Sequence, residues 1–177
     1  MNILCVSETK WPNSDWIKSN DTYDFVFSGG DHHERSVGIL IKKDIRKAVD
    51  GVAAISDRIL YLRIASYPMA ISIIQVYTST EAAPEDVINE FYEQLEKTLR
   101  LAKRGDVKII MGDFDAKVGK GRVTDTVGNY GLGERNEVGD NLLNLQNAMT
   151  YVSQTHGTNN ICKDCTHGKV LKTEKTE

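Results

Sequence analysis

The sequence is poor in the residues that mark several classes of protein. Only three of its 177 residues are cysteines and only three are prolines. No apolar stretch approaches the roughly 18 residues that a transmembrane helix needs, so no membrane span is expected. The N-terminus lacks a basic segment and Glu8 interrupts its apolar run, which argues against a signal peptide. An odd number of cysteines without such a signal favours a reducing compartment.

An excess of positive charge is also missing. The formal net charge is −3, which gives no overall attraction to nucleic acid or to an anionic membrane. A polyanionic substrate would therefore need a local basic patch or bound metal cations. Hydrophobic residues make up 40% and charged residues 27% of the chain, which is the balance of a soluble globular protein with a single core.

The C-terminal part contains a weak metal-binding pattern. Cys162 and Cys165 are separated by two residues, and His156 and His167 lie nearby. Four such side chains could hold zinc if they converged. The alternative is a polar tail with two free thiols, and one pair of cysteines does not decide between them.

Short apolar or alternating runs predict the strands. The second and third runs are expected to pair as antiparallel strands, and the fourth and fifth to form a hairpin through Tyr67 and Pro68. The predicted strands cover residues 2–7, 23–28, 36–41, 59–65, 70–77 and 107–111.

Two helices are predicted from apolar residues that recur every three or four positions. The first covers residues 85–103 and the second about 138–152, with a Gly-rich loop over 117–136 between the last strand and the second helix. A strand, a long helix and a strand in succession indicate a crossover within an α/β sandwich. We expect one domain over residues 1–152 and a polar, solvated or disordered tail over 153–177.

Carboxylates follow two of the predicted strands. Asp113 and Asp115 come after the buried run that ends in Gly112, and Glu8 follows the first strand. Alternating positions of a strand face the same side, and ligand sites in α/β sheets lie beyond strand ends. Oxygen ligands from different strands suit Mg²⁺ or Mn²⁺. Each position also has an ordinary explanation, because aspartates after strands commonly form turns or caps.

Six motifs follow one another along the chain. They are Val-Ser-Glu-Thr-Lys-Trp (6–11), Ser-Val-Gly-Ile-Leu-Ile (36–41), Ser-Asp-Arg-Ile-Leu (56–60), Gln-Val-Tyr-Thr-Ser-Thr (75–80), Met-Gly-Asp-Phe-Asp-Ala-Lys-Val-Gly (111–119) and Gly-Leu-Gly-Glu-Arg-Asn-Glu-Val-Gly (131–139). Taken together, these motifs resemble the endonuclease/exonuclease/phosphatase superfamily. The resemblance is strongest to the endonuclease domains of non-LTR, LINE-type retrotransposons and to craniofacial development protein 2-like sequences, and it extends from residue 3 to about 152.

The resemblance implies a four-layer, DNase I-like α/β sandwich that cleaves phosphodiester bonds with Mg²⁺ (or Mn²⁺). It implies that Glu8 binds the metal, that Asp113 activates the attacking water, and that Tyr77 contacts the scissile phosphate. It further implies a catalytic position for Asp115 and substrate-contacting positions for the three residues Lys10, Thr80 and Asn136. DNA is the implied partner, and the implied location is intracellular and nuclear.

Three departures from the family pattern qualify these expectations. Asp115 stands where the family usually has an asparagine, and an ionised carboxylate cannot donate a hydrogen bond to phosphate. The family's first strand and its last strands, with their Asp-His pair, have no counterpart. The sequence thus predicts a sandwich truncated at both ends. Three functions stay open: a DNA-nicking endonuclease, a non-catalytic binding module, and a lipid or inositol phosphate phosphatase.

Overall fold

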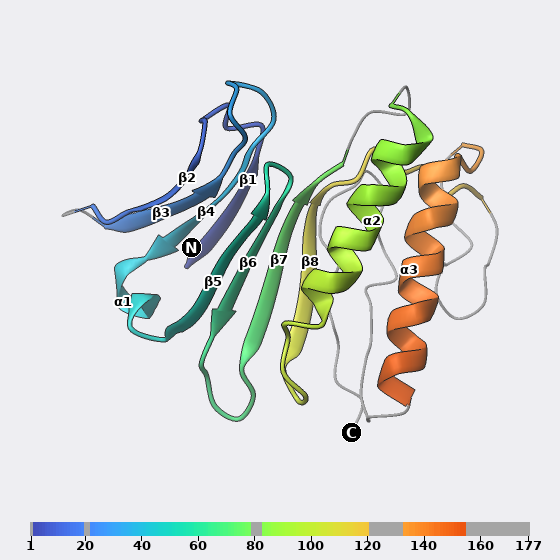
Figure 1. Cartoon of the computed structure of the whole chain (residues 1–177). Coiled ribbons are helices and arrows are strands. Elements are labelled where there is room, and N and C mark those ends of the chain that lie inside the picture. Colours follow the sequence, from blue (N-terminus) through green and yellow to red (C-terminus); the bar gives the residue numbers. More distant parts are fainter. Residues whose placement is uncertain (1, 20–21, 79–82, 121–132, 155–177) are drawn as a thin grey trace.

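The computed structural model describes residues 2–19, 22–78, 83–120 and 133–154, with the side chains of the last range described up to residue 145. Two four-stranded sheets lie face to face, and two helices cover the outer face of one of them (Figure 1). The predicted α/β sandwich is therefore confirmed. The described residues supply three of its layers, in the order sheet, sheet and helix pair.

The first sheet is antiparallel throughout. It contains β1 (Ile3–Ser7), β2 (Ser14–Ile17), β3 (Tyr23–Ser28) and β4 (Val37–Lys42), in the spatial order β1-β4-β3-β2. The pairing of β3 with β4 that the sequence predicted is present. The short helix α1 (Lys43–Arg46) follows β4 and leads into the second sheet.

The second sheet is mixed. It contains β5 (Val49–Ser56), β6 (Ile59–Ile64), β7 (Ile71–Tyr77) and β8 (Val107–Asp113) in sequential order. The predicted β6–β7 hairpin is confirmed, and β7 pairs with β8 in parallel. Parallel neighbours need a crossover connection, which α2 (Glu85–Leu99) provides, as the strand–helix–strand pattern predicted.

An apolar core lies between the two sheets. Aliphatic side chains alternate along β4, so that Val37, Ile39 and Ile41 are fully buried against the inner face of the second sheet, including Leu60 and Leu62. Each such burial contributes about 1.5–3 kcal/mol. The packing of the two inner faces fixes the position of one sheet relative to the other, and this determines where their strand ends meet.

A second core lies under the helices. The other face of β6 and β7 packs against α2, whose apolar positions recur every three or four residues, as in Phe91, Leu95 and Leu99. The helix α3 (Glu137–Gln154) joins the same core through Leu145. It runs beside α2 (Figure 1). The two predicted helices are thus confirmed, although α2 ends four residues earlier than expected and α3 ends two residues later.

Two strands and one helix were not predicted. β5 is built partly from Gly51, Ala53 and Ala54, which are weak strand formers, and its pairing with β6 is interrupted by register shifts. β2 is a four-residue edge strand with only two apolar residues. α1 is a single turn. None of these three has the periodic apolar pattern on which the prediction depended.

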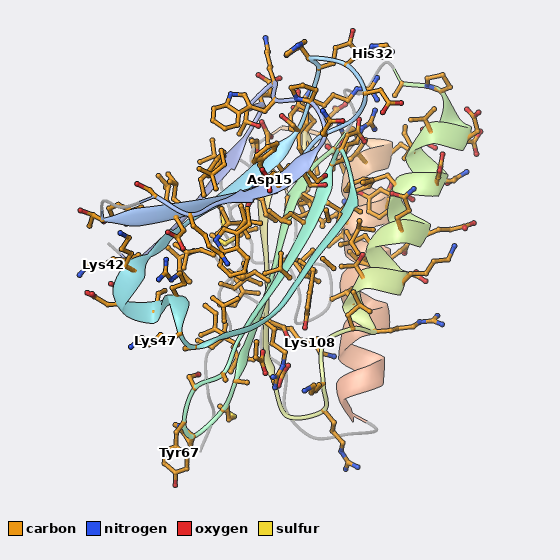
Figure 2. The ribbon with its side chains drawn as sticks, turned by 60° about the vertical axis from the view of Figure 1, so that its left-hand side comes forward. Asp15, His32, Lys42, Lys47, Tyr67 and Lys108 are labelled. Atoms are coloured by element: carbon orange, nitrogen blue, oxygen red, sulfur yellow. The ribbon has the colours of Figure 1, made fainter. Side chains whose placement is uncertain are left out.

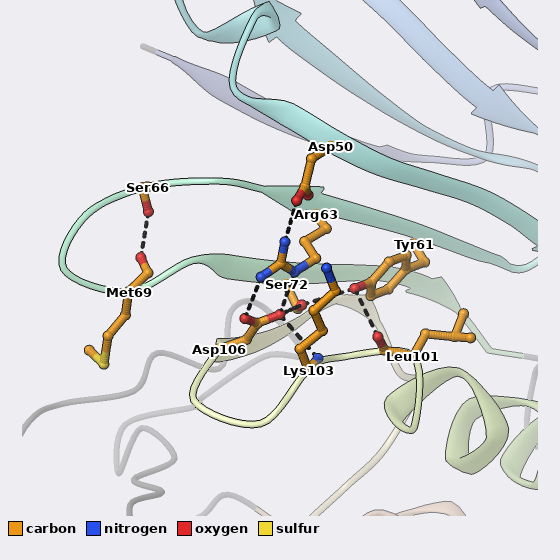
Figure 3. Close-up of polar contacts among 9 residues, drawn as sticks. All are labelled: Asp50, Tyr61, Arg63, Ser66, Met69, Ser72, Leu101, Lys103 and Asp106. Atoms are coloured by element: carbon orange, nitrogen blue, oxygen red, sulfur yellow. Dashed lines mark hydrogen bonds and ion pairs between the residues drawn. The ribbon is translucent and has the colours of Figure 1, made fainter.

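A polar cluster fixes one end of the second sheet (Figure 3). Arg63 of β6 contacts both carboxylate oxygens of Asp106, at 2.7 and 2.8 Å, and also pairs with Asp50 of β5. Ser72 of β7 and the Lys103 backbone N–H donate further hydrogen bonds to Asp106, at 2.8 and 3.1 Å. The cluster therefore ties the loop between α2 and β8 to three strands.

No helix in the described part of the chain is long and apolar enough to cross a membrane. The predicted tail lies almost wholly outside the described residues, since α3 continues to Gln154 and the remainder is not described. The predicted division at residue 152 stays a prediction.

Candidate active site

The predicted site residues that the structure describes gather at one end of the two sheets. Glu8 follows β1 directly, and Tyr77 and Asp113 are the last residues of β7 and β8, where the parallel register places them opposite each other. Strand β1 lies against β7 and β8 across the sheets. Figure 2 shows this end at His32, on the β3–β4 loop, and the opposite end at Tyr67, in the β6–β7 hairpin.

The Tyr77 hydroxyl contacts Glu8 and lies within the electrostatic influence of Asp113 and Asp115. It donates a hydrogen bond to Glu8 Oε1. This hydrogen bond, partial burial, and the negative charges of Glu8, Asp115 and Asp113 raise the pKa of Tyr77 to about 12. The phenol keeps its proton at neutral pH and remains a hydrogen-bond donor. Three carboxylates from two strand ends thus act on one hydroxyl group.

The residues of the turn after β8 determine its backbone conformation. Gly112 has φ +149°, and a Cβ there would lie 1.8 Å from the Val76 carbonyl oxygen, so no side chain fits. Phe114 is buried in the core beneath the helices. Asp115 has φ +45°, and its N–H points to Asp113 Oδ1 at 3.4 Å. The expected alternation of an extended strand therefore stops at Asp113, and the two aspartates are placed by a turn instead.

The loop that carries Glu8 is held by a buried serine. Glu8 and Lys10 have φ +55° and +56°, and Ser36, which is fully buried, has φ +75°. The Ser36 hydroxyl lies 2.5 Å from Thr9 Oγ1 and accepts a hydrogen bond from the Trp11 N–H at 3.1 Å. A single side chain from the start of β4 therefore braces the residues on both sides of Lys10. Sequence reasoning did not assign this role to Ser36, and a serine before an apolar strand gives no signal of it.

Backbone hydrogen bonds of the β5–β6 turn connect Ser36 to Tyr77. The Ser36 N–H donates to the Asp57 carbonyl at 3.0 Å, and the Tyr77 N–H donates to the Arg58 carbonyl at 2.9 Å. Arg35 pairs with the Asp57 carboxylate at 3.4 Å. Burial and the nearby Arg35 charge lower the pKa of Arg58, whose exposed fraction is 8%. Two arginines therefore lie at this turn, Arg35 in an ion pair with Asp57 and Arg58 largely buried near Tyr77.

The Asn136 side chain is hydrogen-bonded to three backbone groups. Its Oδ1 accepts hydrogen bonds from the N–H groups of Lys117 and Gly139, both at 2.9 Å, and its Nδ2 donates to the Asp115 carbonyl at 3.2 Å. The predicted substrate contact of this residue stays a prediction, but most of its hydrogen-bonding capacity is already used. Thr80 lies outside the described residues.

A polar pair that sequence reasoning also missed lies beneath the site. Gln75 is 1% exposed and donates a hydrogen bond to Ser7 Oγ at 3.0 Å. Ser7 is the residue directly before Glu8 in the sequence. Within the described residues its Oε1 has no hydrogen-bond partner, and neither does the buried Thr78 Oγ1. Buried acceptors usually have partners. The only signal in the sequence was an amide within an apolar strand.

The side chains that gather here suit a hard cation. Among the described residues, no three His, Cys, Asp or Glu side chains lie close enough together to enclose a metal ion. Glu8 and Asp113 are the carboxylates that would hold such an ion, because Mg²⁺ needs only one or two carboxylates, with waters and phosphate oxygens as the remaining ligands. The donor set fits Mg²⁺ or Mn²⁺. The possible zinc ligands Cys162 and Cys165 lie outside the described residues.

Comparison with known proteins identifies relatives by sequence. Craniofacial development protein 2 of Bos taurus is 33% identical over 143 residues, covering 81% of this chain, and that of Tragulus javanicus is 32% identical over 145 residues, covering 82%. The chain spans about a quarter of the length of these relatives (24% and 25%). No protein-family model matches the chain.

Two solved structures share the fold. The endonuclease domain of TRAS1, a telomere-specific non-LTR retrotransposon, superposes with a TM-score of 0.56 at 14% identity, over 97% of this chain and 71% of that one. The AP endonuclease LMAP from Leishmania major gives a TM-score of 0.54 at 14% identity, over 88% of this chain and 60% of that one. With craniofacial development protein 2 among its relatives and the DNase I-like fold, the chain belongs to the endonuclease/exonuclease/phosphatase superfamily.

Proposed function

We propose that this chain is a Mg²⁺-dependent phosphodiesterase domain that nicks DNA. The observation that carries the proposal is the meeting of three strand ends, at which the Tyr77 hydroxyl donates to Glu8 and lies within the field of Asp113 and Asp115. A nuclease-type fold and its relatives support the same function. Both the DNA substrate and the nicking activity are proposed.

The two metal-binding carboxylates in this proposal are Glu8 and Asp113. When bound there, Mg²⁺ (or Mn²⁺) would supply Lewis-acid polarisation of a phosphoryl oxygen. Asp113 is the last residue of β8 and Glu8 directly follows β1, so the packing of the sheets and the Ser36 brace set their separation. Tyr77 holds Glu8 by its hydroxyl and would orient it toward the phosphate side.

The remaining side chains divide the chemistry of hydrolysis. Asp113, as an exposed carboxylate, can accept a proton from the attacking water. Lys10 can donate to non-bridging phosphate oxygens, and Tyr77 can do so once its single O–H leaves Glu8. Asp115 can only accept hydrogen bonds while it is ionised, so beside a phosphate it must share the metal or a proton. Arg35 and Arg58 provide positive charge at the same end of the sheets.

DNA is proposed as the substrate because both solved neighbours are endonucleases by name. The charge of Lys10 and that of a bound divalent cation would offset the net charge of −3 toward a phosphate backbone.

The test is a nicking assay on supercoiled plasmid with Mg²⁺. The wild type should convert supercoiled to open-circular plasmid, and EDTA should stop the reaction. Glu8→Gln and Asp113→Asn should each lower the rate by at least about 100-fold, because each removes a charged group of the site. Glu93→Gln, on the exposed face of α2, is the matched control and should keep full activity. Equal rates for all four proteins would contradict the assignment.

Asp115 favours one second candidate, a non-catalytic DNA-binding module. An exposed carboxylate at this position adds repulsion toward phosphate instead of a donor. A folded wild type that binds a DNA duplex but does not nick it with either Mg²⁺ or Mn²⁺ would support this candidate. Restored nicking in Asp115→Asn would then identify Asp115 as the reason.

A further inference from the structure

The segment that follows β8 is fastened to the N-terminus of α3 by one side chain. Asn136 immediately precedes α3, and its Oδ1 accepts the Gly139 N–H at 2.9 Å, which is the contact of a helix N-cap. The same oxygen accepts the Lys117 N–H at 2.9 Å. The amide nitrogen donates to the Asp115 carbonyl at 3.2 Å. Asn136 therefore caps a helix and holds the acidic turn simultaneously.

The first turn of α3 packs closely against residues 117–118, so the two segments cannot shift relative to each other. A Cβ at Gly139 would lie 2.1 Å from the Lys117 carbonyl oxygen. The Asn136 N–H donates to that same carbonyl at 3.1 Å, and Arg135 Nε donates to the Val118 carbonyl at 2.9 Å. The first turn of α3 is thus in direct contact with residues 117–118, and α3 itself is anchored in the core through Leu145.

The group that Asn136 holds is a strained one. Asp115 has φ +45°, a conformation that costs a non-glycine residue on the order of 1 kcal/mol and persists only where neighbours enforce it. Its N–H points to Asp113 Oδ1 at 3.4 Å. A rotation of the Asp115 backbone would therefore move the Asp115 carboxylate and break the contact of the Asp115 N–H with the Asp113 carboxylate.

We propose that Asn136 is a positioning residue that sets the orientation of the Asp113 and Asp115 carboxylates through the Asp115 carbonyl. The inference rests on the function proposed above, in which Asp113 acts on substrate and metal. Both lone pairs of Oδ1 are used, and one of the two N–H groups is used. Its main role is therefore to orient the turn, and at most one N–H is left for a substrate.

Asn136→Asp separates the two tasks of this side chain. Aspartate is as good a helix cap as asparagine, and its charge suits the N-terminus of α3. It cannot donate to the Asp115 carbonyl, so two oxygens would face each other there. The unfolding midpoint should equal that of the wild type, while kcat for nicking should fall about 10–100-fold at little changed KM. Asn136→Ala, which loses the cap as well, should lower both stability and activity.

Three readouts do not depend on nuclease activity. Slow amide exchange at Lys117 and Gly139 should persist in Asn136→Asp and be lost in Asn136→Ala. The NMR signals of the Asp115 amide and the Asp113 carboxyl carbon should shift in Asn136→Asp. A titration with Mn²⁺ should show about 10–100-fold weaker binding.

The outcomes distinguish this proposal from the proposed function. A wild type that neither nicks DNA nor binds Mn²⁺ would refute the proposed function, yet shifted Asp113 and Asp115 signals would still support the positioning role. Unshifted signals in a folded Asn136→Asp variant would overturn the positioning role, whatever the activity. Wild-type kcat and Mn²⁺ affinity in that variant would overturn it equally.

Discussion

Replacing Asp106 by asparagine tests how the second sheet is held together. The Asp106 side chain is 4% exposed and accepts hydrogen bonds from Arg63, Ser72 and the Lys103 N–H. Asparagine keeps the shape but removes the charge that pairs with Arg63. It also turns one acceptor into a donor that faces a guanidinium group. The substitution therefore breaks a largely buried ion pair without creating a cavity.

The pH dependence of stability gives the magnitude. Hydrogen bonds from Arg63 are the largest cause that lowers the pKa of Asp106 from 3.8 to about 2. At about 1.4 kcal/mol per pKa unit this is at most about 2.5 kcal/mol. Asp50, which shares Arg63, is 37% exposed, and screening by water reduces the figure to about 1–2 kcal/mol. Because the folded-state pKa is the lower one, this stability is present above pH 4 and lost as the pH falls through 2.

Urea unfolding at pH 7, 4 and 3 is the measurement. At pH 7, Asp106→Asn should lower the free energy of unfolding by about 1–3 kcal/mol. Between pH 4 and 3 the wild type should lose stability faster than the variant, because only the wild type has this carboxylate to protonate. Asp44→Asn removes an exposed pair with Lys42 and should change stability by less than about 0.5 kcal/mol. Equal effects of the two substitutions, or parallel pH profiles, would refute the reasoning.

Three further substitutions address the site. Gly112→Ala would place a methyl group 1.8 Å from the Val76 carbonyl oxygen and should cost more than about 3 kcal/mol, whereas Gly105→Ala meets nothing within 4 Å and should cost about 1 kcal/mol in thermal unfolding. Ser36→Ala should weaken Mn²⁺ binding by about tenfold. Ser36→Gly should lose the same affinity but be more stable than Ser36→Ala, since glycine suits the positive φ of this position. Unchanged Mn²⁺ affinity would contradict the bracing role. Tyr77→Phe should lower plasmid nicking by at least about tenfold, and full activity would exclude the hydroxyl from the reaction.

Strands with strong apolar alternation could be predicted from the sequence because burial alone decides them. The inner residues of β4, such as Ile39 and Ile41, can only face a core. β5 has Gly51 and two alanines in place of large apolar residues, and in the described part of its sheet it is an edge strand that pairs only with β6, with register shifts. The limits of prediction thus follow from tertiary context, which determines strands whose own residues have weak preferences.

The arrangement of the candidate site was predictable only in part. Carboxylates after apolar strands, and a tyrosine at the end of another, indicated which end of the sheet to examine, and the structure brings Glu8, Tyr77 and Asp113 together there. The supporting residues were not predictable, because Ser36 and Asn136 act through backbone groups distant in sequence. Their partners become neighbours only after the sheets have packed.

Backbone strain links these supports to the candidate site. Among the described residues, six non-glycine residues have positive φ, and five of them lie in the loops that carry or hold the site: Glu8, Lys10, Arg35, Ser36 and Asp115. Each such conformation costs on the order of 1 kcal/mol and survives only where other contacts enforce it. A loop that relaxes would recover that free energy while losing the carboxylate geometry. Substitutions in the supporting residues should therefore impair metal and substrate binding before they unfold the protein, the reverse of what a core substitution does.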